Sequence, residues 1–234
     1  MQTIRPPNLR RITIVTGHYG SGKTEFAVNL ALRETEFPSE YGKRAVCDLD
    51  LVNPYFRSRE RRDILESRNI EVHGSTYRDE ITAEIPALGA SVRAPLENRD
   101  CRVIVDAGGN DSGALVLKQF GKYFTREETD VLAVLNFCRY ETRTAANAIA
   151  QIRAIEAATR LAITGLVGNT HLLRQTDADT VRRGASLTRD VADALKVPIT
   201  AICYPEEFVR ADELAGLDDL FPLKIYMRDT WMDR

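Results

Sequence analysis

The segment TGHYGSGKTEF, residues 16–26, places glycines at positions 17, 20 and 22, and the last of them is followed by Lys23 and Thr24. The preceding run, RRITIVT, is apolar and β-branched, which is typical of a buried strand. The following run, TEFAVNLALRE, repeats its apolar residues at helical spacing. Because a phosphate-binding loop lies between a strand and a helix, this context predicts such a loop rather than a plain glycine-rich turn.

The chemistry of this loop follows from its residue types. Glycines let the backbone approach an anion, and the backbone amides then form a nest that the positive end of the next helix reinforces. Lys23 is expected to reach the β- and γ-phosphates as a catalytic group, and the Thr24 hydroxyl is expected to bind Mg²⁺. The loop residues expected at the nucleotide are Gly17, His18, Tyr19, Gly20, Ser21, Gly22, Lys23, Thr24 and Glu25.

The composition describes an ordinary soluble chain. Its 234 residues are 44% hydrophobic with a net charge of −2, which predicts one globular domain, residues 1–234, without a basic footprint for nucleic acid. No apolar run reaches membrane-spanning length and the first residues lack the apolar part of a secretory signal, so we expect a cytoplasmic protein. The four cysteines form no CxxC pair, which favours small buried side chains over a zinc or iron–sulfur site.

Strand-like and helical runs alternate along the chain, which predicts an α/β domain. We expect a mainly parallel, twisted sheet of about seven strands with helices on both faces, the three-layer sandwich of P-loop NTPases. In such sheets, ligands bind beyond the carboxyl ends of the strands. The expected strands are 12–16, 44–49, 101–105, 131–137, 162–167, 198–203 and 223–227, and the expected helices are 23–33, 112–123, 143–158 and 180–195.

Asp106 follows an apolar run and precedes Ala-Gly-Gly. A carboxylate at a strand end beside a phosphate-binding loop suits Mg²⁺ or one of its waters. Gly108 could then turn its amide toward a γ-phosphate. The alternative is an ordinary turn, since Asp and Gly both favour turns.

Asp48 and Asp50 alternate at the end of the second expected strand, so both side chains point to the same face. One is expected to orient the attacking water and the other to support the metal, which makes both candidate catalytic groups. Two exposed acids in a turn are the alternative.

Asn169 and Pro205 end two later strands. The Asn169 amide can donate and accept hydrogen bonds, as an adenine edge requires, and Pro205 could border the base. Turn residues explain both positions as well.

The motifs GHYGSGKT, DLD, VDAGG and GNT occur in this order. Together they resemble the SIMIBI class of P-loop NTPases, and within it the MinD/ParA/CobQ/CobB-like nucleotide-binding proteins. The resemblance implies ATP and Mg²⁺ as ligands, with Lys23 and Thr24 on the phosphates and metal. It also implies Asp50 in the water-orienting switch and Asp106 in the second switch, with Asn169 near the adenine.

His18 departs from the family pattern. The typical member has a lysine there, which reaches the phosphates of the opposite subunit of a homodimer. A histidine with an ordinary pKa of about 6.5 is mostly neutral at pH 7, and its ring is shorter. We therefore expect another cation to serve the γ-phosphate, and Arg57 or Arg59 is the candidate, with solvated helix-end residues as the alternative.

The leading functional hypothesis is an ATPase switch whose ATP- and ADP-bound forms are read by a protein partner. The alternative is an ATP-dependent small-molecule kinase or ligase, with an acceptor pocket near residues 55–62 or 76–95. A GTPase is disfavoured, because GNTHL lacks the guanine-reading Asn-Lys-x-Asp motif.

Overall fold

The structure is a computed structural model that describes residues 5–50, 61–74, 85–109 and 111–227. Its sheet has eight strands in the order β3-β2-β4-β1-β5-β6-β7-β8, and every neighbouring pair is parallel. The strands are β1 (Ile12–Thr16), β2 (Lys43–Leu49), β3 (Ile70–His73), β4 (Cys101–Ala107), β5 (Thr129–Leu135), β6 (Gly165–Gly168), β7 (Ile199–Pro205) and β8 (Leu220–Leu223).

Helices connect these strands. None of those in the described ranges is long and apolar enough to cross a bilayer. They are α1 (Lys23–Glu34), α2 (Arg62–Glu66), α3 (Ile85–Glu97), α4 (Asp111–Gln119), α5 (Ala145–Thr159) and α6 (Ala178–Leu195).

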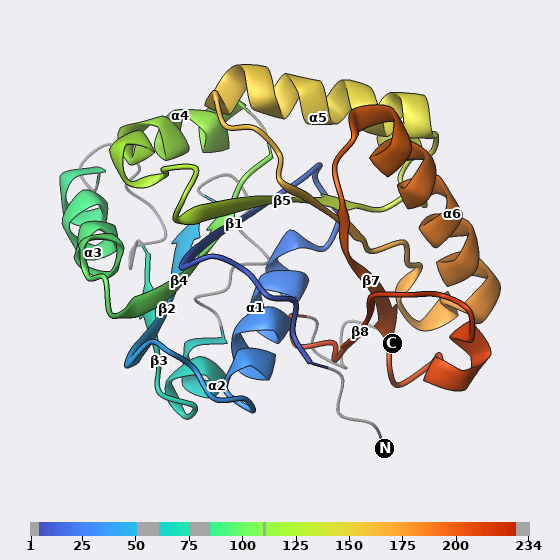
Figure 1. The fold of residues 1–234 in the computed structure, drawn as a ribbon, viewed down its shortest axis with the longest axis horizontal. Helices are drawn as coiled ribbons and strands as arrows, with labels where there is room; N and C mark the ends of the chain where they lie inside the picture. Colours follow the sequence, from blue (N-terminus) through green and yellow to red (C-terminus); the bar gives the residue numbers. More distant parts are fainter. Residues whose placement is uncertain (1–4, 51–60, 75–84, 110, 228–234) are drawn as a thin grey trace.

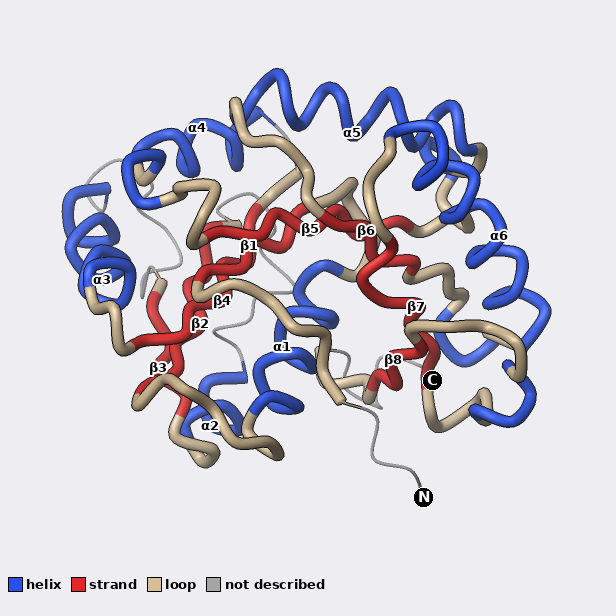
Figure 2. The backbone as a smooth tube through the Cα atoms, viewed as in Figure 1, coloured by secondary structure: helices blue, strands red, loops and turns tan. Residues whose placement is uncertain are grey.

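The helices form a layer on each face of the sheet (Figures 1 and 2). Phe26 of α1 and Leu65 of α2 share one apolar cluster with Val15 of β1. The preceding residue of β1, Ile14, points to the opposite face and packs in a second cluster with Leu117 of α4. Since successive side chains of a strand alternate between faces, an almost wholly apolar strand is buried on both sides.

The predicted fold class is confirmed, and the structure adds a strand at the edge. β3 has four residues, which is too short for a clear pattern, and it pairs with β2 from Arg44 to Cys47. The last expected strand, 223–227, is wrong in its bounds because β8 ends at Leu223.

α3 overlaps residues 76–95, which no sequence pattern assigned to a helix or strand. Its sequence, IPALGASVRAPLE, contains Gly89 and carries Pro95 inside the helix, and both residues disfavour helix in isolation. Buried Val92 and Leu96 pack it against the sheet, so burial outweighs the weak local preference. The expected helix 112–123 ends earlier, at Gln119, and a 3₁₀ turn follows at Gly121–Tyr123.

The cysteines behave largely as expected. All four are free; Cys47, Cys101 and Cys203 are buried, and Cys138 is half-buried. Burial raises the pKa of the Cys47 and Cys203 thiols, which keeps both protonated as small apolar side chains.

The contact between Phe26 and Phe221 packs edge strand β8 onto α1, with ring centroids 5.4 Å apart in an edge-to-face arrangement. Replacing the buried Phe221 by Ala should lower the free energy of unfolding by about 3–5 kcal/mol, since the burial and the ring contact are lost. Denaturant unfolding followed by circular dichroism measures the change. Phe208 is 37% exposed, so Phe208→Ala should lower it by less than about 1 kcal/mol. Equal losses in the two variants would contradict this packing.

Candidate functional site

The loop between β1 and α1 has glycines in the backbone conformation that the predicted phosphate-binding loop requires. Gly20 and Gly22 have φ of 73° and 84°, in the left-handed region that favours glycine, and α1 begins directly after Gly22. A Cβ atom at Gly22 would lie 2.3 Å from Nδ2 of Asn169. Glycine at this position is therefore required by both conformation and close packing.

Two buried asparagines hold the carbonyl groups of this loop. Asn169 Nδ2 donates to the Ser21 carbonyl at 2.8 Å, and Asn136 Nδ2 donates to the Gly20 carbonyl at 3.4 Å. Asn136 follows β5 and Asn169 follows β6, which are successive neighbours of β1 in the sheet. These contacts fix the positions of two carbonyl groups of the loop.

Lys23 lies within a group of buried acids. Its Nζ is 3.9 Å from Oδ2 of Asp50, and both side chains are buried. Asp48 is paired in register with Asp106 across β2 and β4, and the Asp50 amide donates to Asp48 Oδ1 at 3.2 Å. The structure therefore brings together the three acids that the sequence singled out, beside the lysine of the loop.

The carboxyl group of Asp106 is fully buried. Burial raises its pKa, the Asp48 carboxylate raises it further, and Lys23 and the Thr24 hydroxyl lower it. Thr24 approaches closely enough to affect this pKa, yet neither Asp106 oxygen makes a hydrogen bond of normal geometry within the described chain. Crowded carboxylates of this kind favour a cation as a neighbour.

The oxygen donors at this place suit Mg²⁺, which prefers carboxylate and hydroxyl oxygens and is often held by one or two protein groups together with substrate phosphates. Thr24 and Asp106 are such groups. Within the described residues, no set of three or more His, Cys, Asp or Glu side chains forms a metal cage. The donor set therefore fits a metal shared with phosphates rather than a closed protein site.

A cavity of about 410 Å³ opens beside the loop, on the side of β6, β7 and β8. Apolar side chains from Leu173, Pro205 and Ile225 line one part, and the phosphate-binding loop lines another. This division suits a ligand with an apolar ring and an anionic chain. The predicted residues that line it are His18, Tyr19, Gly20, Gly22, Lys23, Thr24, Glu25, Asn169 and Pro205.

Other predicted residues lie outside this cavity lining. Gly17 and Ser21 belong to the loop but do not line the cavity. The three acids, Asp48, Asp50 and Asp106, do not line it either. A larger hollow of about 1070 Å³ contains no residue of the loop and lies beside the opposite ends of the strands, so it is separate from this chemistry.

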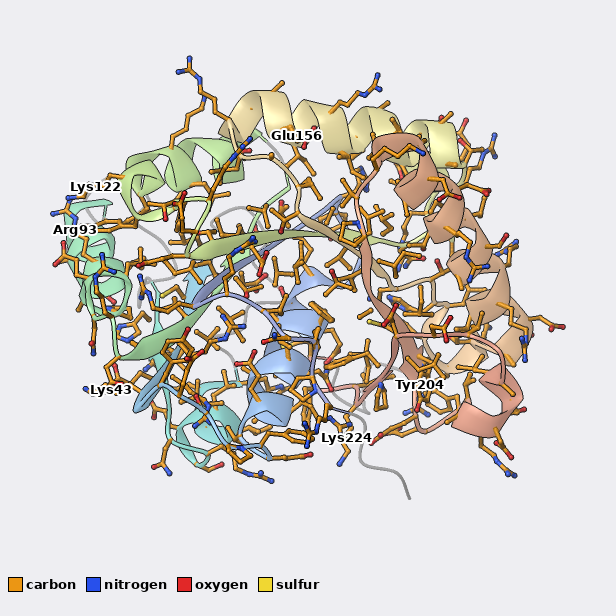
Figure 3. The ribbon with its side chains drawn as sticks, viewed as in Figure 1. Lys43, Arg93, Lys122, Glu156, Tyr204 and Lys224 are labelled. Atoms are coloured by element: carbon orange, nitrogen blue, oxygen red, sulfur yellow. The ribbon has the colours of Figure 1, made fainter. Side chains whose placement is uncertain are left out.

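Glu25 has a role that the sequence did not reveal. Its carboxylate accepts hydrogen bonds from the amides of Tyr226 at 2.7 Å and Met227 at 3.2 Å, and burial raises its pKa to about 7. One turn later, Asn29 exchanges two hydrogen bonds with the backbone of Lys224, which Figure 3 labels. α1 thereby fixes the segment after β8 that completes the apolar wall.

His171 lies over the loop. Burial and the nearby Arg139 lower its pKa to about 4, so the ring is neutral at pH 7. The Leu173 amide donates to Nδ1 at 3.3 Å, which assigns the ring proton to Nε2. That nitrogen is 3.4 Å from the position of a Cβ atom at Gly22. His171 is thus a neutral hydrogen-bond donor at the cavity, and no sequence motif identified it as a candidate site residue.

The turn after β4 contacts the loop directly. A Cβ atom at Gly109 would lie 1.8 Å from the Gly17 carbonyl oxygen, and one at Gly113 of α4 would lie 2.3 Å from the Gly108 oxygen. The turn formed by Gly108 and Gly109 therefore packs between the loop and α4. Arg57, Arg59 and most of the proposed acceptor regions lie outside the described residues.

No protein-family model matches this chain, and no curated protein matches its sequence. Among solved structures, it is similar to chloroplast FtsY from Physcomitrella patens, with 20% identity, a TM-score of 0.54, and coverage of 90% of this chain and 64% of that one. FtsY from Mycoplasma mycoides is 15% identical, with a TM-score of 0.48 and coverage of 86% and 62%. A nucleotide-binding protein from Archaeoglobus fulgidus in complex with ADP is 16% identical, with a TM-score of 0.45 and coverage of 81% of each chain.

The chain spans about three-fifths of the length of the FtsY structures it matches. At such identities the likeness shows the fold alone. It shows a parallel α/β architecture shared with the FtsY structure from Physcomitrella patens, and it does not identify the MinD/ParA-like branch.

Proposed function

We propose that the chain binds ATP with Mg²⁺ at residues 17–24, hydrolyses it slowly and acts as a nucleotide-controlled switch for a protein partner. The observation that carries this proposal is the buried group formed by Lys23, Asp50 and Asp106 beside the glycine-rich loop between β1 and α1. Burying charged side chains lowers the stability of a protein, so their presence here indicates a functional requirement. This group therefore points to a charged ligand.

Each residue has a role in this proposal. Thr24 and Asp106 would hold Mg²⁺, which when bound neutralises charge on the phosphate oxygens. Lys23 binds the β- and γ-phosphates. Asp50 orients the attacking water, and Asp48 stabilises the arrangement through its contact with the Asp50 amide.

The base site favours adenine. The chain reads Asn169-Thr170-His171-Leu172 where a guanine-reading loop has Asn-Lys-x-Asp. Leu172 is 43% exposed and supplies no carboxylate to the N1–H and N2 amino groups of guanine. Asn169 lines the cavity while its amide nitrogen binds the Ser21 carbonyl, so its oxygen is the group that we propose near the adenine.

A switch requires that the phosphate site be linked to a surface. The turn at Gly108 and Gly109 packs on Gly17 and on α4, so a ligand that moves the loop also displaces this turn. In the described chain, the exposed large hydrophobic side chains all lie on loops that follow β1, β5, β6 and β7, at the same edge as the cavity. They support a protein partner or a homodimer at this edge. They are Tyr19, Tyr140, Leu172 and Phe208.

The first test replaces Lys23 by Ala. We expect ATP affinity to fall by about 100-fold or more, because the cation nearest the loop's phosphate position is lost. Calorimetry with ATP and Mg²⁺ measures it. Lys43→Ala is the control, because Lys43 lies at the amino end of β2, away from the site (Figure 3), and its variant should bind as the wild type does. Unchanged affinity in Lys23→Ala would overturn the nucleotide site.

Replacing Asp50 by Asn separates binding from hydrolysis. The variant should bind ATP and slow turnover by about 100-fold, because an amide orients the attacking water poorly. Phosphate release under single-turnover conditions measures the rate, and Asp63→Asn on α2 provides a control for the charge change. If Asp50→Asn hydrolyses ATP at the wild-type rate, Asp50 does not orient the water.

Replacing Asp106 by Asn should have two opposite effects. Mg²⁺ should enhance ATP binding less, because a metal ligand is weakened. In the absence of nucleotide the protein should become more stable by about 1 kcal/mol, because the cost of burying an ionised carboxyl group and the repulsion from Asp48 are both removed. The gain should be larger at pH 8 than at pH 6, since the raised pKa means that ionisation of Asp106 destabilises the wild type as the pH rises. Denaturant unfolding at both pH values measures the stability, and calorimetry with and without Mg²⁺ measures the effect of the metal on ATP binding. A variant that is less stable than the wild type and equally dependent on Mg²⁺ would contradict Asp106 as a metal ligand.

A further inference from the structure

We propose that Arg139, on the loop after β5, is a phosphate-binding residue that supplies the cation absent at position 18. This inference rests on the proposed nucleotide site and names a further group in it. The guanidinium is expected to bind the phosphate chain of the nucleotide from the side opposite the acids that surround Lys23.

The guanidinium of Arg139 lies against the phosphate-binding loop. Its Nε donates to the Gly20 carbonyl at 2.9 Å. A Cβ atom at Gly20 would lie 3.1 Å from this Nε and 3.6 Å from Cζ, so a side chain at position 20 would push the guanidinium away. Arg139 also lines the same cavity as Lys23 and His171.

The loop that carries Arg139 is held in place by Asn136, which is fully buried. Asn136 Oδ1 accepts hydrogen bonds from the Cys138 amide at 3.0 Å and from the His171 amide at 3.3 Å. Its backbone carbonyl accepts one from the Thr142 hydroxyl at 2.7 Å. Arg139 therefore lies on a turn whose backbone is fixed by these hydrogen bonds. Binding a phosphate would require little further ordering of this turn.

Charge favours an anion at this place. Lys23 and Arg139 are the permanently charged cations among the cavity-lining residues. Lys23 has Asp50 beside it, whereas Arg139 makes no ion pair within the described residues, although Glu141 lines the same cavity. His171 stays neutral next to Arg139, so it adds a donor and no competing charge. An arginine with this freedom presents a planar set of donors that matches phosphate.

His18 is poorly placed for this task. Its Nδ1 contacts the carbonyl of the next residue, Tyr19, at 2.9 Å on the exposed side of the loop. Arg139, by contrast, follows β5, the strand next to β1, and its Nε donates to the Gly20 carbonyl of the loop. The proposed replacement cation thus lies about 120 residues from the loop in the sequence, and no sequence pattern near the loop predicts it.

The experiment separates phosphate binding from simple support of the loop. In Arg139→Gln, the amide nitrogen occupies the same place along the side chain as Nε, so it can still donate to Gly20 while the guanidinium charge is lost. Affinities for ATP and for inorganic tripolyphosphate are measured by calorimetry or competition in the wild type, Arg139→Gln and Arg139→Ala. Arg143→Ala is the matched control, because Arg143 is an exposed arginine of the same loop that packs over the Tyr140 ring.

We expect both Arg139 variants to lose about 10- to 100-fold in affinity for ATP and for tripolyphosphate, with Arg143→Ala unchanged. If Arg139→Gln binds both probes like the wild type, Arg139 only positions the loop and the proposal is overturned. A loss for ATP without a loss for tripolyphosphate would place the contact on the nucleoside and also overturn it. If the wild type itself binds no ATP, the proposed function fails and this inference fails with it, whereas the other outcomes leave that function standing.

Discussion

The hydrogen bonds from Asn136 and Asn169 to the carbonyls of Gly20 and Ser21 are the constraint on which the rest of the site depends. They fix a glycine-rich turn that otherwise has many accessible conformations. Asn136 follows β5, the neighbour of β1, and Asn169 follows β6, the next strand along, so the parallel sheet places both side chains beside the loop. With the loop set, the start of α1 and the positions of Lys23 and Thr24 follow from chain geometry.

The acids beside Lys23 work against stability and thereby indicate function. Asp48 and Asp106 face each other across neighbouring strands, and burial makes the ionisation of Asp106 unfavourable. A protein selected for stability alone would place apolar residues there. In the proposed function, a metal ion with bound phosphates would resolve this conflict.

The two ends of the site are held by different parts of the chain. On one side, the turn at Gly109 packs on Gly17 and connects the loop to α4. On the other, Glu25 and Asn29 of α1 hold the backbone after β8, which forms the apolar wall. α1 therefore connects the loop to the apolar wall, and in the proposed function it would link the phosphate end of the nucleotide to its base.

The sequence alone determined the glycine-rich loop between a strand and a helix and the order of most strands and helices, and it singled out Asp48, Asp50 and Asp106, because each rests on local spacing or alternation. The short edge strand β3 and the proline-containing α3 escaped this reasoning, since their local preferences are weak and burial decides them. Asn136 and Arg139 contact the loop from more than 100 residues away, and Glu25 and Tyr226 are 201 residues apart in the chain. Only the tertiary structure could assign these roles, because hydrogen bonds between distant segments leave no periodic trace in the sequence.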